Sequence, residues 1–268
     1  RDVRLIADED AGFAPDVQAE IRAAAIDLLI AKAGQEPAVF DPGNALMLEM
    51  MRHCMAEDIA PDYAPMMREE MGLCPRDVPW EAPPAPQRLA EMQVLIVGAG
   101  ASGLILAARL KRLGIRYTIV EKAKEVGGTW RDNRYPGCGV DTPNHAYSFS
   151  MGSRYRWRSY FSPRDQLWDY LRRAADEFGV RPDIRFETEV TAARWDAARN
   201  LWVVSVQTPA GPGTIEANVL VSAIGQFGLP YVPRIKGMES FKGRMFHTTE
   251  WPEDLDVRGK RIAIIVNE

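Results

Sequence analysis

The glycines at residues 98–103 are the first residues whose spacing predicts chemistry. Gly98, Gly100 and Gly103 form a GxGxxG pattern, with Ala101 and Ser102 before the last glycine. In such a pattern the first glycine permits a tight turn, the second lets a diphosphate approach the backbone, and the third brings a helix against a strand. The diphosphate then lies at the positive end of the helix dipole. The segment therefore predicts a loop that binds a dinucleotide.

An acidic residue closes the next apolar run, YTIVEK, which ends in Glu121 and Lys122. A carboxylate at the end of that strand accepts hydrogen bonds from ribose hydroxyls and would repel a 2′-phosphate. The alternative is a glycine turn followed by an unrelated surface glutamate. The order of strand, glycine turn, helix and strand favours the nucleotide site, with Glu121 beside the cofactor.

A second glycine turn stands in EVGGTWRDNRYPG, residues 125–137. Two adjacent glycines followed by an aromatic residue suit a flat ring system that lies against the backbone. This favours a flavin over a nicotinamide. The aromatic residue of this run, Trp130, has the alternative of being plain core.

The elements around these turns predict an α/β fold. The run VLIV at 94–97 lacks polar alternation, as expected of a parallel strand that is covered on both faces. With a helix over 102–113 and the strand of YTIVEK, it makes a β-α-β unit. Residues 184–222 alternate in polarity and predict a small antiparallel meander that returns to the parallel sheet. The returning run, VSAIG, brings Ala223 and Gly225 beside the diphosphate.

Four segments follow from these patterns. Residues 1–74 carry three runs at helical spacing and predict a small all-α domain. Residues 75–90 form a linker. It is expected to be stiff and extended, because its first part holds five prolines, each of which fixes its own φ and lacks a backbone donor. Residues 91–250 form a Rossmann-like flavin-binding domain, with the parallel sheet and the small antiparallel meander. Residues 251–268 form a second linker and the first strand of a further domain, at 262–266.

The composition excludes several classes of protein. Apolar residues at 46% and charged residues at 26% are ordinary for a globular protein and argue against disorder. A net charge of −4 gives no reason to expect a nucleic-acid partner, so the basic and aromatic run at 154–161 is expected to be surface beside the cofactor. No run approaches the ~20 apolar residues of a membrane span. The three cysteines indicate reduced thiols in a cytoplasmic protein, and their spacing fits no metal site.

The methionines of MLEMMRHCM, residues 47–55, are expected to be core or a helix-docking surface, with a ligand pocket as the alternative. His53 and His145 have no companions at metal-ligand spacing, so no metal is expected.

Two longer patterns give a resemblance to a known family. FKGRMFHTTEW, residues 241–251, matches FxGxxxHxxxW at Phe241, Gly243, His247 and Trp251. GGTWRDNRYPGCGVD, residues 127–141, matches a second pattern of the same family in the correct order after the glycine loop. On these residues the chain resembles the Baeyer–Villiger monooxygenases, a branch of the class B flavoprotein monooxygenases. The run YPGCGVDTPNHAYSFS and the helical extension are similar to the 4-hydroxyacetophenone monooxygenase subgroup.

The resemblance implies an enzyme that depends on FAD and NADPH. In the family, NADPH reduces the flavin, O₂ adds to give a peroxyflavin, and the peroxide attacks a ketone that rearranges to an ester or lactone. FAD would be held by this chain, and NADPH by a domain that lies mostly beyond it. The apolar helical faces of the extension suggest docking on the main body of the protein or on a second subunit, and the second case would give a homodimer. Because the last strand is not followed by a second glycine loop, the chain is expected to be a portion of a longer protein and inactive alone.

The resemblance also assigns roles to single residues. The adenosine half of FAD would be held by Gly98, Gly100, Ala101, Ser102, Gly103, Glu121 and Lys122. The flavin end would be surrounded by Gly128, Thr129, Trp130, Asp141 and Tyr147, while Val190 meets the adenine through its backbone. Asp141 is the candidate catalytic residue, because a carboxylate there tunes an arginine from the NADP domain; its alternative is a cap for the loop after Pro136. The interdomain motif of Phe241, Gly243, His247 and Trp251 would transmit domain movement, and His247 is expected to be a satisfied interdomain histidine.

Two other functions stay open at this point. One is a non-catalytic FAD-binding or partner-docking module, which would be yellow but would not consume NADPH. The other is a flavin-containing or N-hydroxylating monooxygenase, which would give an oxygenated amine or sulfide and no ester.

Overall fold

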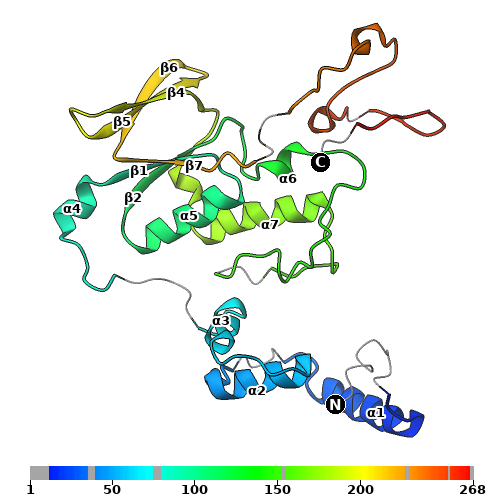
Figure 1. Cartoon of the computed structure of the whole chain (residues 1–268). Coiled ribbons are helices and arrows are strands. Elements are labelled where there is room, and N and C mark those ends of the chain that lie inside the picture. Colours follow the sequence, from blue (N-terminus) through cyan, green and yellow to red (C-terminus); the bar gives the residue numbers. More distant parts are fainter. Residues whose placement is uncertain are drawn as a thin grey trace. The chain divides into compact units, whose positions relative to one another are not determined.

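The computed structural model describes residues 12–35, 40–74, 80–151, 155–226, 228, 230–252 and 254–265. The chain divides into two compact units, Arg1–Arg76 and Asp77–Glu268. Figure 1 gives the order of the elements along the chain.

The first unit is helical, as predicted. Its helices are α1 (Pro15–Ala31), α2 (Gly43–Met55) and α3 (Tyr63–Glu70). A proline opens α1, where its missing N–H would have no partner in any case. Met47 of α2 and Ala64 of α3 are buried, whereas Met50 and Met55 are exposed, so the methionine run is core only in part.

The second unit contains two sheets, which confirms the predicted parallel sheet and antiparallel meander. The four-stranded parallel sheet has the order β3-β2-β1-β7, and the three-stranded antiparallel sheet has the order β4-β5-β6. The strands are β1 (Gln93–Val97), β2 (Arg116–Val120), β3 (Ile184–Arg185), β4 (Glu189–Asp196), β5 (Leu201–Thr208), β6 (Gly211–Ala217) and β7 (Val219–Ser222). The helices are α4 (Pro86–Glu91), α5 (Ala101–Arg112), α6 (Thr129–Asp132) and α7 (Arg164–Glu177), with short 3₁₀ turns at Arg181–Asp183, Met238–Ser240 and Thr248–Glu250.

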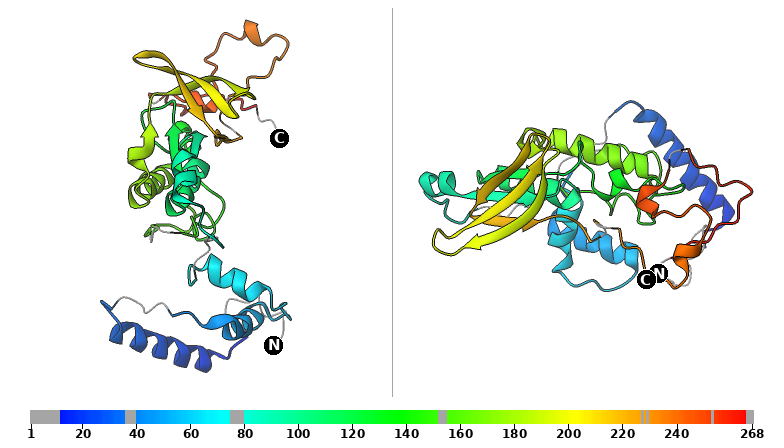
Figure 2. Two further views of the ribbon diagram at one scale, coloured as in Figure 1. Left: turned by 90° about the vertical axis from the view of Figure 1, so that its left-hand side faces the viewer. Right: turned by 90° about the horizontal axis from the view of Figure 1, so that it is seen from above.

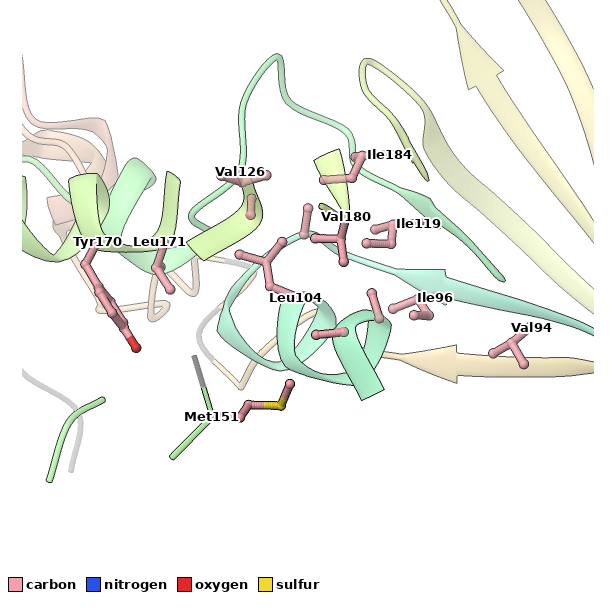
Figure 3. Packing of buried hydrophobic residues seen from close by; sticks show 14 residues of the cluster. Val94, Ile96, Leu104, Ile119, Val126, Met151, Tyr170, Leu171, Val180 and Ile184 are labelled. Atoms are coloured by element: carbon pink, nitrogen blue, oxygen red, sulfur yellow. The ribbon is translucent and has the colours of Figure 1, made fainter. Parts of the chain in front are cut away.

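The parallel sheet is covered on both faces. Helices α5 and α7 lie on one side, and the antiparallel sheet lies on the other (Figures 1 and 2). Side chains alternate along a strand, so Val94 and Ile96 of β1 join Leu104 of α5 in one apolar cluster (Figure 3). Leu95 points the other way and packs with Val204 of β5. Full burial of each of these side chains stabilises the unit by roughly 1.5–3 kcal/mol, which is why the run shows no polar alternation.

Three expectations need correction. Ile184–Arg185 belongs to the parallel sheet, because it pairs with β2, and the meander begins only at β4. The proline-rich linker is not extended throughout, because α4 begins at Pro86, where proline is tolerated in the first turn. Residues 262–265 form no strand, and the side chains of these isoleucines are exposed. A strand needs a neighbour for its backbone groups, and within the described residues none pairs with this run; residue 266 lies outside them.

No helix in the described part of the chain is long and apolar enough to span a membrane.

Candidate dinucleotide-binding site

The glycine loop joins the carboxyl end of β1 to the start of α5. Gly98 has a φ of +106°, and a Cβ there would lie 2.6 Å from the carbonyl oxygen of Ala223. A Cβ on Gly103 would lie 2.0 Å from the carbonyl oxygen of Gly98. These are impossible contacts for a carbon atom, so strands β1 and β7 and helix α5 can approach this closely only because both residues are glycine.

The two glycine turns face each other across a narrow gap. A Cβ on Gly100 would lie 3.7 Å from the Cα of Gly128, and one on Gly128 would lie 3.2 Å from the Cα of Gly100. The Gly127 N–H donates to the carbonyl oxygen of Ala99 at 3.0 Å, which holds the turns together. The result is a cradle without side chains that a bound group could approach closely.

The start of α5 supplies the electrostatics of this cradle. Gly100 is the residue before the first turn, and no side chain caps the helix there. The first backbone N–H groups of a helix have no partner within it and carry the positive end of its dipole. Helix α5 therefore points a positive end toward the cradle, which favours an anionic group such as a diphosphate.

Glu121 lies at the end of β2, beside the loop, and is buried rather than exposed. Its Oε2 accepts the Ala99 N–H at 2.8 Å, and its Oε1 accepts the Ala123 N–H at 2.9 Å. Arg131 Nη1 donates to Oε1 at 3.1 Å, and the side chains of this pair are 9% and 6% exposed. The carboxylate thus shapes the glycine loop as well as facing the site.

Arg131 was not among the predicted site residues. It lies on α6, and its guanidinium also bonds the carboxylate of Asp132 and the carbonyl of Glu125. Burial alone would lower the pKa of Arg131, but the bonds to Asp132 and Glu121 outweigh it and leave the pKa above the usual arginine value. No spacing rule points to such a residue, because its role depends on a carboxylate ten positions away in another element.

Trp130 and Tyr147, both predicted to lie at the flavin end, contact each other. Trp130 Nε1 donates to the Tyr147 hydroxyl at 3.1 Å, and the rings pack edge to face at 5.8 Å. Thr129 is exposed at the start of α6, and its Oγ1 accepts a bond from Asn133. The two aromatic residues are therefore a fixed pair rather than independent side chains.

Trp168 of α7 supports the second glycine turn. Its Nε1 donates to the carbonyl of Val126 at 2.9 Å, and a Cβ on Gly127 would lie 2.6 Å from its ring. The guanidinium of Arg164 stacks 4.6 Å from the centre of the same ring, while donating to the carbonyl of Arg131. The sequence did not predict this support of the glycine turn by Trp168 and Arg164. The helical spacing of Leu167, Trp168 and Leu171 could have indicated a buried helix face.

Of the other predicted cofactor residues, Ala223 lies beside the glycine loop, whereas Asp141 and Val190 have no such backbone contact in the described part of the chain. The Ala223 N–H donates to Val97 at 2.9 Å, which places the residue after β7 beside the loop, and Gly225 follows with a φ of +74°. Lys122 and Asp141 are exposed. Val190 packs in the apolar cluster beneath the antiparallel sheet. Within the described residues, no backbone hydrogen bond links Asp141 or Val190 to the glycine loop.

The FxGxxxHxxxW segment is organised locally. The His247 ring accepts the Thr249 N–H at 3.2 Å and so caps the 3₁₀ turn that follows it. Trp251 packs edge to face on Phe246 at 5.3 Å. Phe241 is exposed, and its ring lies where a Cβ on Gly243 would be.

An open cavity of about 690 Å³ lies beside the loop that carries Asp141. Its walls include Tyr135, Cys138, Phe161 and Trp168. A hydrogen bond with Cys138 raises the pKa of Tyr135. The three cysteines are free thiols, and within the described residues no group of three or more His, Cys, Asp or Glu side chains could hold a metal ion.

Comparison with known proteins identifies similar chains. The family model described as an NAD(P)-binding Rossmann-like domain matches residues 96–173. An uncharacterized monooxygenase, y4iD, of Sinorhizobium fredii is 37% identical over 97% of this chain and 39% of its own length. A Baeyer–Villiger monooxygenase of Streptomyces coelicolor is 42% identical over 65% of this chain and 33% of its own length. The crystal structure of OTEMO in complex with FAD and NADP is similar with a TM-score of 0.55 and 36% identity, over 61% of this chain and 31% of that one. The chain thus spans between 31% and 39% of the length of these proteins.

Proposed function

Because the chain belongs to the Baeyer–Villiger class of flavoprotein monooxygenases, we propose that it is the FAD-binding part of an enzyme that oxidises a ketone to an ester or lactone. The oxygen atom comes from O₂, and NADPH is the reductant. The single observation that carries the proposal is the glycine cradle at the positive end of α5, where Gly100 and Gly128 face each other without side chains and Gly98 and Gly103 allow the tight turn beneath it.

FAD would lie along this site with its diphosphate at the glycine cradle. The backbone N–H groups at the start of α5 would hold the diphosphate, with Ala101 and Ser102 in the first turn. Glu121 would accept a hydrogen bond from the adenosine ribose, and the exposed Lys122 would lie at the edge of the same site. Trp130 and Tyr147 would lie beside the ring system. Ala223 and Gly225, which follow strand β7, would lie beside the diphosphate. Val190 would meet the adenine through its backbone.

When bound, FAD supplies the redox chemistry that activates O₂. The chain's own residues would bind and orient the cofactor: the positive end of α5 would hold the diphosphate, and the Trp130–Tyr147 pair would lie against the ring system. Asp141 is proposed to be the catalytic carboxylate, which positions a cationic side chain beside the reacting oxygen. Its exposure leaves room for that partner.

Phe241, Gly243, His247 and Trp251 are proposed to couple the FAD-binding part to the part that binds NADPH. The His247 cap and the Phe246–Trp251 contact support this role, because they give an otherwise irregular segment a defined shape. The protein is proposed to be cytoplasmic. Within the class, a relation to the 4-hydroxyacetophenone monooxygenase subgroup rests on the YPGCGVDTPNHAYSFS run and on the helical extension.

A homodimer is proposed through the first unit. No described residue of α1 is buried, and the helix exposes apolar side chains along its second half, at Ile26, Leu28, Leu29 and Ile30. Exposed apolar surface of this kind favours association. Light scattering on the purified protein should give twice the monomer mass, and Leu29→Asp should return it to the monomer; a monomeric wild type would refute the proposal.

The experiment that tests the function uses the whole protein of which this chain is part. Purified protein should carry an absorbance band of bound flavin, consume NADPH when a panel of ketones is added, and give an ester or lactone by mass spectrometry. Bound flavin without any consumption of NADPH would indicate a non-catalytic module. An oxygenated amine or sulfide without ester would indicate the flavin-containing or N-hydroxylating type.

A further inference from the structure

The buried ion pair between Glu121 and Arg131 joins the two ends of the candidate site. Glu121 ends β2, where the adenosine would lie, whereas Arg131 is one residue after Trp130 on α6, at the ring end. Nη1 of Arg131 lies 3.1 Å from Oε1 of Glu121, and both side chains are more than nine-tenths buried. A pair this deeply buried is costly to desolvate and gives little net stability by itself. Its presence at the cofactor site therefore calls for a role in binding.

The hydrogen bonds of the Glu121 carboxylate leave one of its acceptor sites free. A carboxylate has about four lone-pair sites. The Ala99 N–H takes one on Oε2, and the Ala123 N–H and Arg131 take those on Oε1. One acceptor site remains, on Oε2. The carboxylate can therefore take a single ribose hydroxyl, and it cannot grip both hydroxyls of the diol while Arg131 is in place.

Arg131 is itself held firmly in this orientation. Its Nε donates to Asp132 Oδ1 at 2.7 Å, and its Nη1 also donates to the Glu125 carbonyl. The carbonyl of Arg131 accepts a bond from Arg164, which stacks on Trp168. The guanidinium is thus fixed from both its side chain and its backbone, so it can fix Glu121 in turn.

We propose that Arg131 is a positioning residue for the cofactor, which holds Glu121 turned so that its one free acceptor takes the 2′-hydroxyl of the adenosine ribose. This inference rests on the proposed function as an FAD site. Without Arg131, the buried carboxylate loses its charged hydrogen-bond partner and is drawn toward water. Its free acceptor would then no longer face the ribose.

The test measures the dissociation constants of FAD and of an FAD analogue that lacks the adenosine 2′-hydroxyl, by fluorescence titration of the flavin-free full chain. The wild type should prefer FAD by about tenfold or more, the worth of one hydrogen bond to a charged group. Arg131→Met should bring this ratio close to one, and Arg131→Lys should restore most of it, because a single charged N–H suffices for the bond to Glu121. Arg199→Met is the matched control, because it removes an arginine that pairs with Asp196 and Glu216 on the antiparallel sheet, outside the site.

A purely structural role predicts a different result. Arg131→Met would then weaken both ligands by the same factor and leave the ratio at the wild-type value, which overturns the inference. If that variant does not fold, the double variant Glu121→Gln with Arg131→Met, which leaves no unpaired buried charge, still decides: a ratio that stays at the wild-type value overturns the proposal. A wild type that binds FAD without preferring the 2′-hydroxyl refutes the role of Glu121 and of Arg131 together. A wild type that binds neither ligand refutes the proposed FAD site itself.

Discussion

Replacing the second or the third glycine of the loop by alanine should have different effects on fold stability and on cofactor binding. Gly103→Ala should destabilise the fold, whereas Gly100→Ala should leave the fold intact and weaken cofactor binding. The difference follows from what each new methyl group would meet. At position 103 it would lie 2.0 Å from the carbonyl oxygen of Gly98, but at position 100 its nearest neighbour would be the Cα of Gly128 at 3.7 Å.

The magnitudes follow from these distances. A contact of 2.0 Å forces the loop and α5 apart by about 1 Å, and such overpacking costs about 1–3 kcal/mol. In a unit of this size, each kcal/mol lowers the unfolding midpoint by roughly 2–4 °C. Gly100 has an extended backbone, which alanine also adopts, so the free energy of unfolding should change by less than about 1 kcal/mol. The methyl group would instead occupy the cradle and cost at least one backbone bond to the diphosphate, about 1.5–3 kcal/mol, or roughly a 10- to 100-fold loss of affinity.

Two measurements on the same preparations check this prediction: the thermal unfolding midpoint of the flavin-free protein, and the dissociation constant of FAD. Gly213→Ala is the control, because a Cβ there meets only the Val206 side chain, at 3.5 Å on the antiparallel sheet. It should change neither quantity much. If Gly100→Ala bound FAD as tightly as the wild type, the cradle would not be the diphosphate site, and the argument for a dinucleotide would fail.

Three further predictions concern the support of the site. Trp168→Ala should lower the free energy of unfolding by about 3 kcal/mol in urea titrations, because it removes the ring that packs on Gly127 and the bond to Val126; a loss below 1 kcal/mol would mean that the clamp is slack. Tyr147→Phe removes the acceptor of the Trp130 indole N–H and should cost about 1 kcal/mol while shifting the tryptophan fluorescence; unchanged emission would argue against the pair. Burial raises the pKa of Tyr170 to about 12, so its contribution to stability is present below pH 10 and is lost as pH rises toward 12. Tyr170→Phe should flatten the alkaline fall in stability, and equal slopes for both proteins would contradict the assigned pKa.

Much of the architecture could be read from local patterns. The apolar run of β1, the glycine spacing and the strand of β2 predict a β-α-β unit, because periodicity and turn chemistry act over a few neighbouring residues. The same holds for the meander and for the helices of the first unit. The predictions failed where a partner was needed. The two-residue β3 is too short to show a period, and the isoleucines at 262–265 have the composition of a strand but pair with no strand in the described part of the chain.

The residue types at the candidate site are visible in the sequence because glycine, glutamate and tryptophan each have a chemical reason to stand at their positions. Their mutual arrangement is not visible there. That Gly100 faces Gly128, that Arg131 neutralises Glu121, and that Trp168 backs the second turn all depend on elements far apart in the chain coming within a few ångströms. Short-range patterns indicate the local conformation that a segment prefers. Burial and charge pairing depend on the tertiary packing, which determines the neighbours of each side chain.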